Sequence, residues 1–216
     1  QLEVVEAMGM CPWAREARED GRVDVRAVLD ADPDPQAMLE IVDAIAADEA
    51  TEIGIMLFPQ VDLGRAAWER FHARLRNLDA DRYEYGVSPM TSAAFHPEGE
   101  PNAGSGDLLK PLIRRSPDPL IQLVRVRVLD AVRGERTGGT TVLDVGDIAG
   151  LDLDAIKALS VKPKSVSQVV ADSNLRTVRR MGVARVVELL DDIRRDRDET
   201  YARLGEPVRP DGAQGV

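Results

Sequence analysis

The stretch TEIGIMLFP, residues 51–59, is a short, continuous apolar run that ends at a proline. A run of this length is typical of a central β-strand that is covered on both faces. Two further runs, PMTSAAFHP at 89–97 and LIQLVRVRV at 120–128, have similar lengths and boundaries. In GRVDVRAVLD, residues 21–30, Val and Ala alternate with polar residues, which predicts a strand with one buried face. The sequence therefore predicts four strands.

Amphipathic helices are predicted between and after these strands. Residues 32–50 carry an apolar stripe, with Asp34 as the expected N-cap. In residues 63–82, apolar side chains recur every three or four positions, which predicts a second helix. The last quarter of the chain has the same periodicity, and Gly205 is expected to end the final helix.

Strands that alternate with helices, followed by a helical C-terminus, indicate an α/β (α+β) fold. We expect a small mixed sheet of about four strands packed with helices, in a single domain over residues 1–205. Residues 206–216 are expected to form a disordered tail. Residues 97–119 are rich in Pro and Gly and form the least regular interior segment, so we expect a long functional loop there.

The composition excludes several classes of protein. With 38 acidic residues against 28 basic ones, the net charge is −10, which argues against general nucleic-acid binding. No apolar run is long enough to span a membrane, and the start of the sequence shows no secretory signal. A single cysteine fits a reducing compartment. We therefore expect a cytoplasmic protein that binds neither nucleic acid nor a membrane, and an oligomer remains compatible with the sequence.

His96 is the first candidate functional residue, because it stands where a predicted strand meets the predicted long loop. A side chain in this position is held by a rigid element and faces a segment that can shape a pocket. An imidazole there is suited to acid/base work, to metal ligation or to axial ligation of haem iron. The alternative is a histidine that hydrogen-bonds to the loop for structural reasons.

Cys11 and His72 are the other candidates of this kind. Cys11 precedes a predicted helix, and a helix N-terminus lowers a thiol pKa, so it suits a nucleophile or a metal ligand. The alternative for Cys11 is a small buried apolar residue. His72 lies on the flank of an amphipathic helix, where a solvated or partly packed position is expected.

Positive charge gathers around the predicted loop despite the acidic composition. These residues are suited to binding a carboxylate or phosphate, or else pair with the abundant acidic residues; they are Lys110, Arg114, Arg115, Arg125 and Arg127. The segment RRDRDETYAR, residues 194–203, is expected to be a solvated, charged helix face.

Four motifs in register resemble a bacterial family, the domain-of-unknown-function family fourteen-fifteen. They are CPWA at 11–14, AAFHP at 93–97, RSPDPLIQLVR at 115–125 and NLRTVRRMG at 174–182. The resemblance marks as site residues Cys11, Pro12, His96, Pro97, Arg115, Ser116, Pro117, Pro119, Arg125 and Asn174.

The chain departs from the family pattern at four positions. Gln122 stands where the family has a second histidine, and Val126 stands where it has a glutamate. Trp13 replaces the usual Phe, and Asp118 replaces the usual Tyr. A metal site built from two histidines and a glutamate would therefore lack two ligands in this chain.

From these residues we expect a small-molecule enzyme, an iron- or haem-dependent oxidoreductase, with a pocket around His96. His96 would act as an acid/base group or as the sole axial ligand of haem, with Cys11 nearby. An anionic substrate would be bound by Arg115, Ser116, Arg125 and Asn174. The alternative is a non-catalytic module that binds a ligand or a protein partner. The sequence does not identify the cofactor beyond the suitability of haem for a single histidine.

Overall fold

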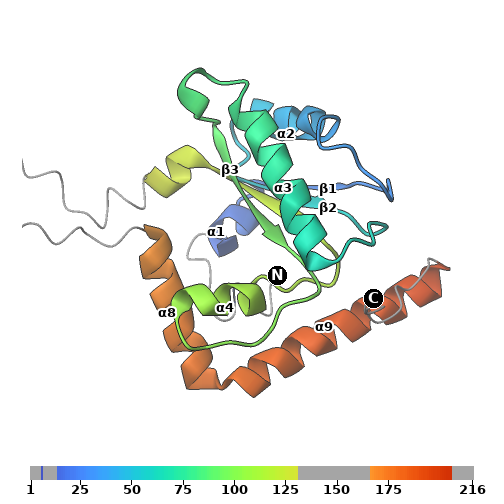
Figure 1. The fold of residues 1–216 in the computed structure, drawn as a ribbon, viewed down its shortest axis with the longest axis vertical. Helices are drawn as coiled ribbons and strands as arrows, with labels where there is room; N and C mark the ends of the chain where they lie inside the picture. Colours follow the sequence, from blue (N-terminus) through green and yellow to red (C-terminus); the bar gives the residue numbers. More distant parts are fainter. Residues whose placement is uncertain (1–5, 7–13, 131–165, 206–216) are drawn as a thin grey trace, which may run out of the picture.

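The computed structural model describes residues 6, 14–130 and 166–205, and Figure 1 shows the fold. A four-stranded sheet has the order β1-β2-β4-β3. β1 is parallel to β2, and the other two pairs are antiparallel. The strands are β1 (Val23–Ala27), β2 (Ile53–Leu57), β3 (Met90–Phe95) and β4 (Leu120–Arg125). This mixed sheet, followed by a helical C-terminus, confirms the predicted fold class.

Helices surround the sheet, and the longest of the described helices, α9 (Val183–Leu204), lies at the C-terminus. α8 and α9 meet at a sharp corner, and α9 itself is a long, straight helix (Figure 1). Gly182 at this corner and Gly205 after α9 both have positive φ, which glycine adopts without strain. The helices are α1 (Ala14–Glu19), α2 (Met38–Ala47), α3 (Arg65–Ala80), α4 (Gly106–Ile113), α8 (Val166–Met181) and α9 (Val183–Leu204), with a 3₁₀ turn η2 at Glu84–Gly86.

The first hydrophobic core lies between one face of the sheet and helices α2 and α3. Successive strand residues point to opposite faces, so Met56, Ile121 and Leu123 share this face. Trp68 of α3 is fully buried against them and makes an edge-to-face contact with Phe58, with ring centroids 4.9 Å apart. The predicted central strand is thus β2, which has a neighbour on each side.

A second core is built from helices alone. Leu109 and Leu112 of α4 pack with Val178 of α8 and with Val186 and Leu190 of α9. Leu190 and Ile193 of α9 lie on the sheet face opposite to α2 and α3, since they line one cavity with Ile55 and Gln122. The fold therefore brings together two separately packed parts, and the candidate site lies where they meet.

Several predicted details are wrong. The expected loop 97–119 contains α4, whose N-cap Ser105 accepts a hydrogen bond from the Leu108 N–H at 3.2 Å. α2 begins at Met38 rather than after Asp34, because residues 35–37 form a turn in which Asp34 accepts the Gln36 N–H. β1 has no fully buried face, and Val25 is 59% exposed, because β1 is an edge strand.

Gly54 on β2 allows α2 to approach the sheet closely. A Cβ atom at this position would lie 2.7 Å from Cγ2 of Ile45. Gly54→Ala is therefore expected to destabilise the fold by about 1–3 kcal/mol, because α2 must shift. Urea unfolding measures this cost. Gly64→Ala is the matched control, because an added Cβ there meets nothing within 4 Å. Equal stability of the two variants would contradict this packing.

Candidate functional site

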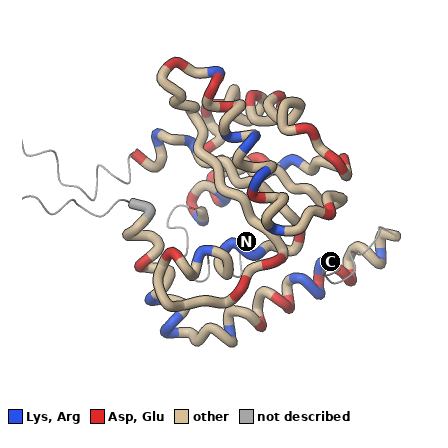
Figure 2. Tube along the Cα trace, viewed as in Figure 1, with Lys and Arg blue, Asp and Glu red and all other residues tan. Residues whose placement is uncertain are grey.

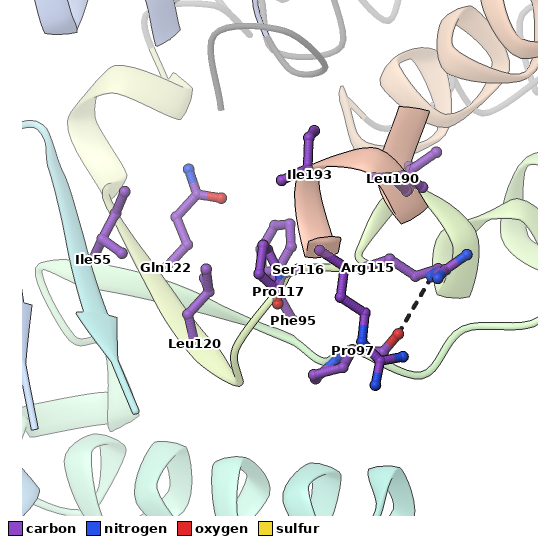
Figure 3. Close-up of a pocket in the computed structure, with 12 residues that line it drawn as sticks. Ile55, Phe95, Pro97, Arg115, Ser116, Pro117, Leu120, Gln122, Leu190 and Ile193 are labelled. Carbon is purple, nitrogen blue, oxygen red and sulfur yellow. Dashed lines mark hydrogen bonds between the residues drawn. The ribbon is translucent and has the colours of Figure 1, made fainter. Parts of the chain in front are cut away.

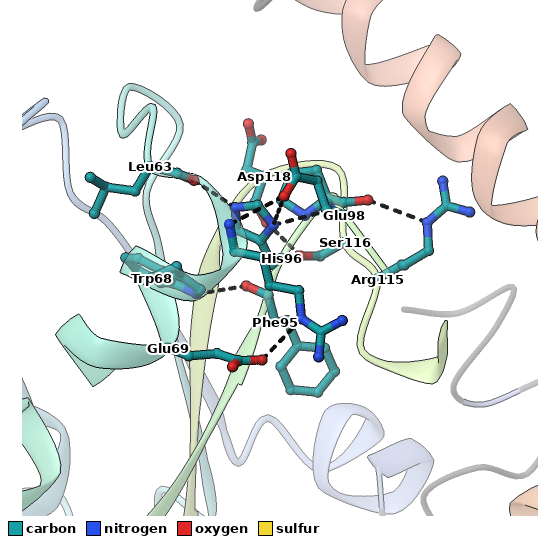
Figure 4. Close-up of polar contacts among 11 residues, drawn as sticks. Leu63, Trp68, Glu69, Phe95, His96, Glu98, Arg115, Ser116 and Asp118 are labelled. Atoms are coloured by element: carbon teal, nitrogen blue, oxygen red, sulfur yellow. Dashed lines mark hydrogen bonds and ion pairs between the residues drawn. The ribbon is translucent and has the colours of Figure 1, made fainter. Parts of the chain in front are cut away.

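His96 lies directly after β3 and is 6% exposed. Its Nε2 atom is 2.8 Å from the carbonyl oxygen of Leu63, and its Nδ1 atom is 3.1 Å from the backbone nitrogen of Glu98 (Figure 4). A carbonyl oxygen only accepts and an amide N–H only donates, so Nε2 carries the hydrogen and Nδ1 accepts. Both ring nitrogens are therefore engaged by the backbone.

This geometry does not fit an axial haem ligand. Iron binds an imidazole through an unprotonated ring nitrogen, and in His96 that nitrogen already accepts the Glu98 N–H. The cavity beside His96 is lined by charged residues such as Arg65, Glu69 and Lys110 rather than by an apolar wall. Within the described residues, no three His, Cys, Asp or Glu side chains gather closely enough to hold a metal ion. The structure favours the structural alternative for His96.

A different cavity lies between the sheet and α9 (Figure 3). Its volume is about 130 Å³, and its wall is mostly apolar. Cavities of about 150 Å³ with aliphatic walls hold one benzene molecule. It is lined by Ile55, Phe95, Pro97, Ile113, Arg115, Ser116, Pro117, Leu120, Gln122, Leu190, Ile193 and Arg194.

Strand register explains which side chains enter this cavity. Ile55 and Gln122 are paired across β2 and β4, as are Phe95 and Leu120 across β3 and β4. Paired residues share a face, so all four point away from the α2–α3 core. His96 follows Phe95 and lines the other cavity, on the α3 side. His96 lies beside Arg115 and Ser116 along the backbone, since the Ser116 N–H donates to the His96 carbonyl oxygen at 3.3 Å, but its ring lines a different cavity from theirs.

Arg115 and Ser116 do line the sheet–α9 cavity, and both also hold the chain in place. The Arg115 guanidinium donates to the Asp191 carboxylate of α9 at 2.6 Å and to the Pro97 carbonyl at 3.3 Å. The Ser116 hydroxyl donates to the carbonyl oxygen of Asp118 at 2.5 Å. An anionic ligand at Arg115 would thus compete with Asp191.

Arg125 is at the opposite end of β4 from Leu120, and its side chain is 7% exposed overall. Its guanidinium donates to three carbonyl oxygens at and after the C-terminus of α2, those of Ala46, Asp48 and Thr51. A cation in this position completes the hydrogen bonds of a helix end. The length of β4 separates Arg125 from Arg115, so the structure does not bring these two predicted substrate-binding residues together.

The remaining predicted site residues divide into two groups. Asn174 is buried on α8, at 5% exposure, and lines neither cavity. Cys11, Pro12 and Trp13 lie outside the described residues, as does the predicted tail 206–216.

Two departures from the family pattern lie in or next to β4. Val126 follows the last residue of β4 and does not line the sheet–α9 cavity, whereas Gln122 does line it.

Sequence reasoning missed the contact that fixes α9. Asp118 is 3% exposed, and its carboxylate accepts hydrogen bonds from the Arg197 guanidinium and from the Tyr201 hydroxyl, the latter at 2.9 Å. The guanidinium also stacks over the Tyr201 ring, with its central carbon 4.4 Å from the ring centroid. The prediction that residues 194–203 are only a solvated face is therefore wrong for Arg197 and Tyr201.

The electrostatics of this contact follow from its burial. Burial disfavours the charged form of Arg197, but its bonds to the Asp118 and Asp198 carboxylates outweigh that effect and raise the pKa of the guanidinium. Burial, together with the bond to Asp118, raises the pKa of the Tyr201 hydroxyl. Tyr201 therefore keeps its proton and remains a donor to Asp118 at neutral pH.

The chain matches no protein-family model, no curated protein and no solved structure. The resemblance to the domain-of-unknown-function family rests on the four motifs alone and stays a prediction. In the described part of the chain, no helix combines the length and the apolar character needed to cross a membrane.

A structural His96 has measurable consequences. Nitrogen NMR of the imidazole is expected to find the neutral Nε2–H form at neutral pH.

His96→Ala is expected to cost about 2–3 kcal/mol of unfolding free energy, because two backbone groups lose their partners. His72→Ala, which removes a single bond to the Ser92 hydroxyl, is the control and should cost less. Haem added to the protein should give no absorption band that depends on His96; such a band would contradict this assignment.

Proposed function

We propose that this protein binds a small, mainly apolar molecule with one polar end in the cavity between the sheet and α9. The observation that carries the proposal is the composition of the cavity wall. Eight of its twelve lining residues are Ile, Leu, Phe or Pro, and the polar groups are few. Apolar walls with a small number of placed polar groups are the usual character of a ligand site.

Binding is favoured over catalysis by the chemistry of the same wall. Its described residues include no His, Cys, Asp or Glu side chain, the groups that most often act as general acids, bases or nucleophiles. The Ser116 hydroxyl donates its hydrogen to a backbone carbonyl oxygen rather than to a base. A non-catalytic ligand-binding module therefore fits this cavity better than a haem-dependent oxidoreductase.

Gln122 is the residue that would recognise the polar end of the ligand. Its side chain lies in the cavity, and no described residue hydrogen-bonds to its amide (Figure 3). An amide has both donors and an acceptor, so its best partner presents both as well. A ring or short chain that ends in a carboxamide has this chemistry and a size that suits about 130 Å³.

Benzamide and toluene test the proposal, because they share a ring and differ in the polar end. Binding is measured through the methyl NMR signals of Ile55, Ile113 and Ile193, which line the cavity. Ile45 of α2, which is buried in the first core, is the control signal. We expect benzamide to shift the three cavity signals and to bind more tightly than toluene, because toluene leaves the Gln122 amide unpaired.

Gln122→Leu is expected to reverse this preference, changing the ratio of the two affinities by about tenfold or more. Gln60→Leu, at an exposed glutamine, should leave the ratio unchanged. The proposal fails if neither probe shifts the cavity signals, or if both probes shift Ile45 as strongly as the cavity residues.

A further inference from the structure

Both histidines of the chain line a second cavity, which lies between α3, the end of β3 and α4. Its volume is about 310 Å³, and charged side chains dominate its wall. Figure 2 shows basic and acidic residues interspersed over the described chain, so the pairing of each charge decides what such a cavity can bind.

The three carboxylates of this cavity are already engaged. Glu69 pairs with Arg65 at 2.9 Å, and Asp107 pairs with Lys110 at 2.7 Å. Glu98 accepts the backbone N–H of Arg65 at the start of α3, at 3.2 Å, and lies 3.8 Å from Nδ1 of His96. A carboxylate at a helix N-terminus is stabilised by the helix dipole. These acidic groups therefore have partners of their own.

Arg114 is the third cation that lines this cavity, besides Arg65 and Lys110. It directly follows α4, and among the described residues no carboxylate lies within salt-bridge distance of its guanidinium. Arg114 is exposed to solvent, and the protein around its guanidinium lowers its pKa by burial, against the opposing charge of Glu69. A guanidinium that lines a cavity and has no carboxylate at salt-bridge distance among the described residues is a favourable place for an anion.

His72 lines the same cavity, from α3. Its Nε2 atom is 2.8 Å from the Ser92 hydroxyl of β3. The pKa of His72 is lowered to about 4, first by burial, then by the charges of Arg76 and Arg114, against the opposing effect of Glu69. The ring is therefore neutral at pH 7, and Arg76 and Arg114 together outweigh Glu69 in disfavouring its charged form.

We propose that this cavity binds a small oxyanion, which pairs with the Arg114 guanidinium beside His72. A guanidinium presents parallel N–H groups that match the oxygens of a carboxylate, a sulfate or a phosphate. The bound anion also offsets the repulsion that disfavours a proton on His72. This site is separate from the sheet–α9 cavity, and the inference does not rest on the function proposed for that cavity.

The His72 ring is a direct reporter, because the chain has only two histidines. Its pKa is followed by proton NMR of the imidazole in sodium sulfate and in sodium formate, each compared with sodium chloride at equal ionic strength. Sulfate is expected to raise the pKa of His72 by about one unit above its value in chloride, since an anion favours the charged imidazole. A larger effect of formate than of sulfate would identify a carboxylate as the preferred oxyanion.

Two variants separate a built site from a general effect of charge. Arg114→Gln should raise the pKa of His72 in chloride and abolish the response to sulfate, whereas Arg114→Lys should keep a weaker response. Arg76→Gln removes a charge that also acts on His72 but lies outside the cavity, so it should raise the pKa in chloride and keep the response. The inference is overturned if neither anion shifts His72 in the unmodified protein, or if Arg76→Gln abolishes the response as fully as Arg114→Gln.

Discussion

The carboxylate of Asp118 is the point at which the C-terminal helix is fixed to the sheet. It stands in the short turn that leads into β4, and it is bonded to Arg197 and Tyr201 near the end of α9. The side chains of both charged partners are less than a tenth exposed. Removing one member of a buried pair leaves the other charge without compensation, which costs far more than breaking a surface pair. The position of α9 therefore depends on this contact and on the Arg115–Asp191 pair beside it.

The cavity follows from how α9 is held. The polar contacts of Asp118 and Arg115 support the helix from the turn 114–119, while Leu190 and Ile193 face the sheet across the cavity. The first core uses the other face of the same strands, so Leu120 and Gln122 are not needed to pack α2 and α3. An apolar wall and the Gln122 amide, to which no described residue hydrogen-bonds, are thus left together in a space of small-molecule size.

The fold was largely predictable because the strands are local patterns. The continuous run at β2 and the three-to-four spacing at α3 depend on the periodicity of neighbouring residues, and both elements are present where expected. α4 was missed because Pro111 and the glycines around it suggested a loop, although Ser105 is a good N-cap. Helix α9 was predicted, but the burial of Arg197 was not, since its partner lies 79 residues away in the sequence.

The candidate site was less predictable, because it depends on which face a side chain takes at the end of a strand. Arg115, Ser116 and Gln122 line one cavity, since they lie in and just before β4. His96 was assigned to the same pocket because it stands at a strand end before the predicted loop and in register with the other motifs, but the alternation of β3 continues through Phe95 and turns its ring to the other side. Arg125 shares a strand with Gln122, yet it lies at the far end of that strand, where its side chain caps α2.

Hydrogen exchange of the backbone amides of α9 tests most directly whether Asp118 holds this helix. In Asp118→Asn, amides between Ile193 and Leu204 are expected to lose about 100-fold in protection or more, while β2 and β4 exchange as in the unmodified protein. Asp192→Asn, at the exposed pair with Arg195, is the matched control and should leave α9 unchanged. Unchanged protection of α9 in Asp118→Asn, or an equal loss across the sheet, would contradict the account.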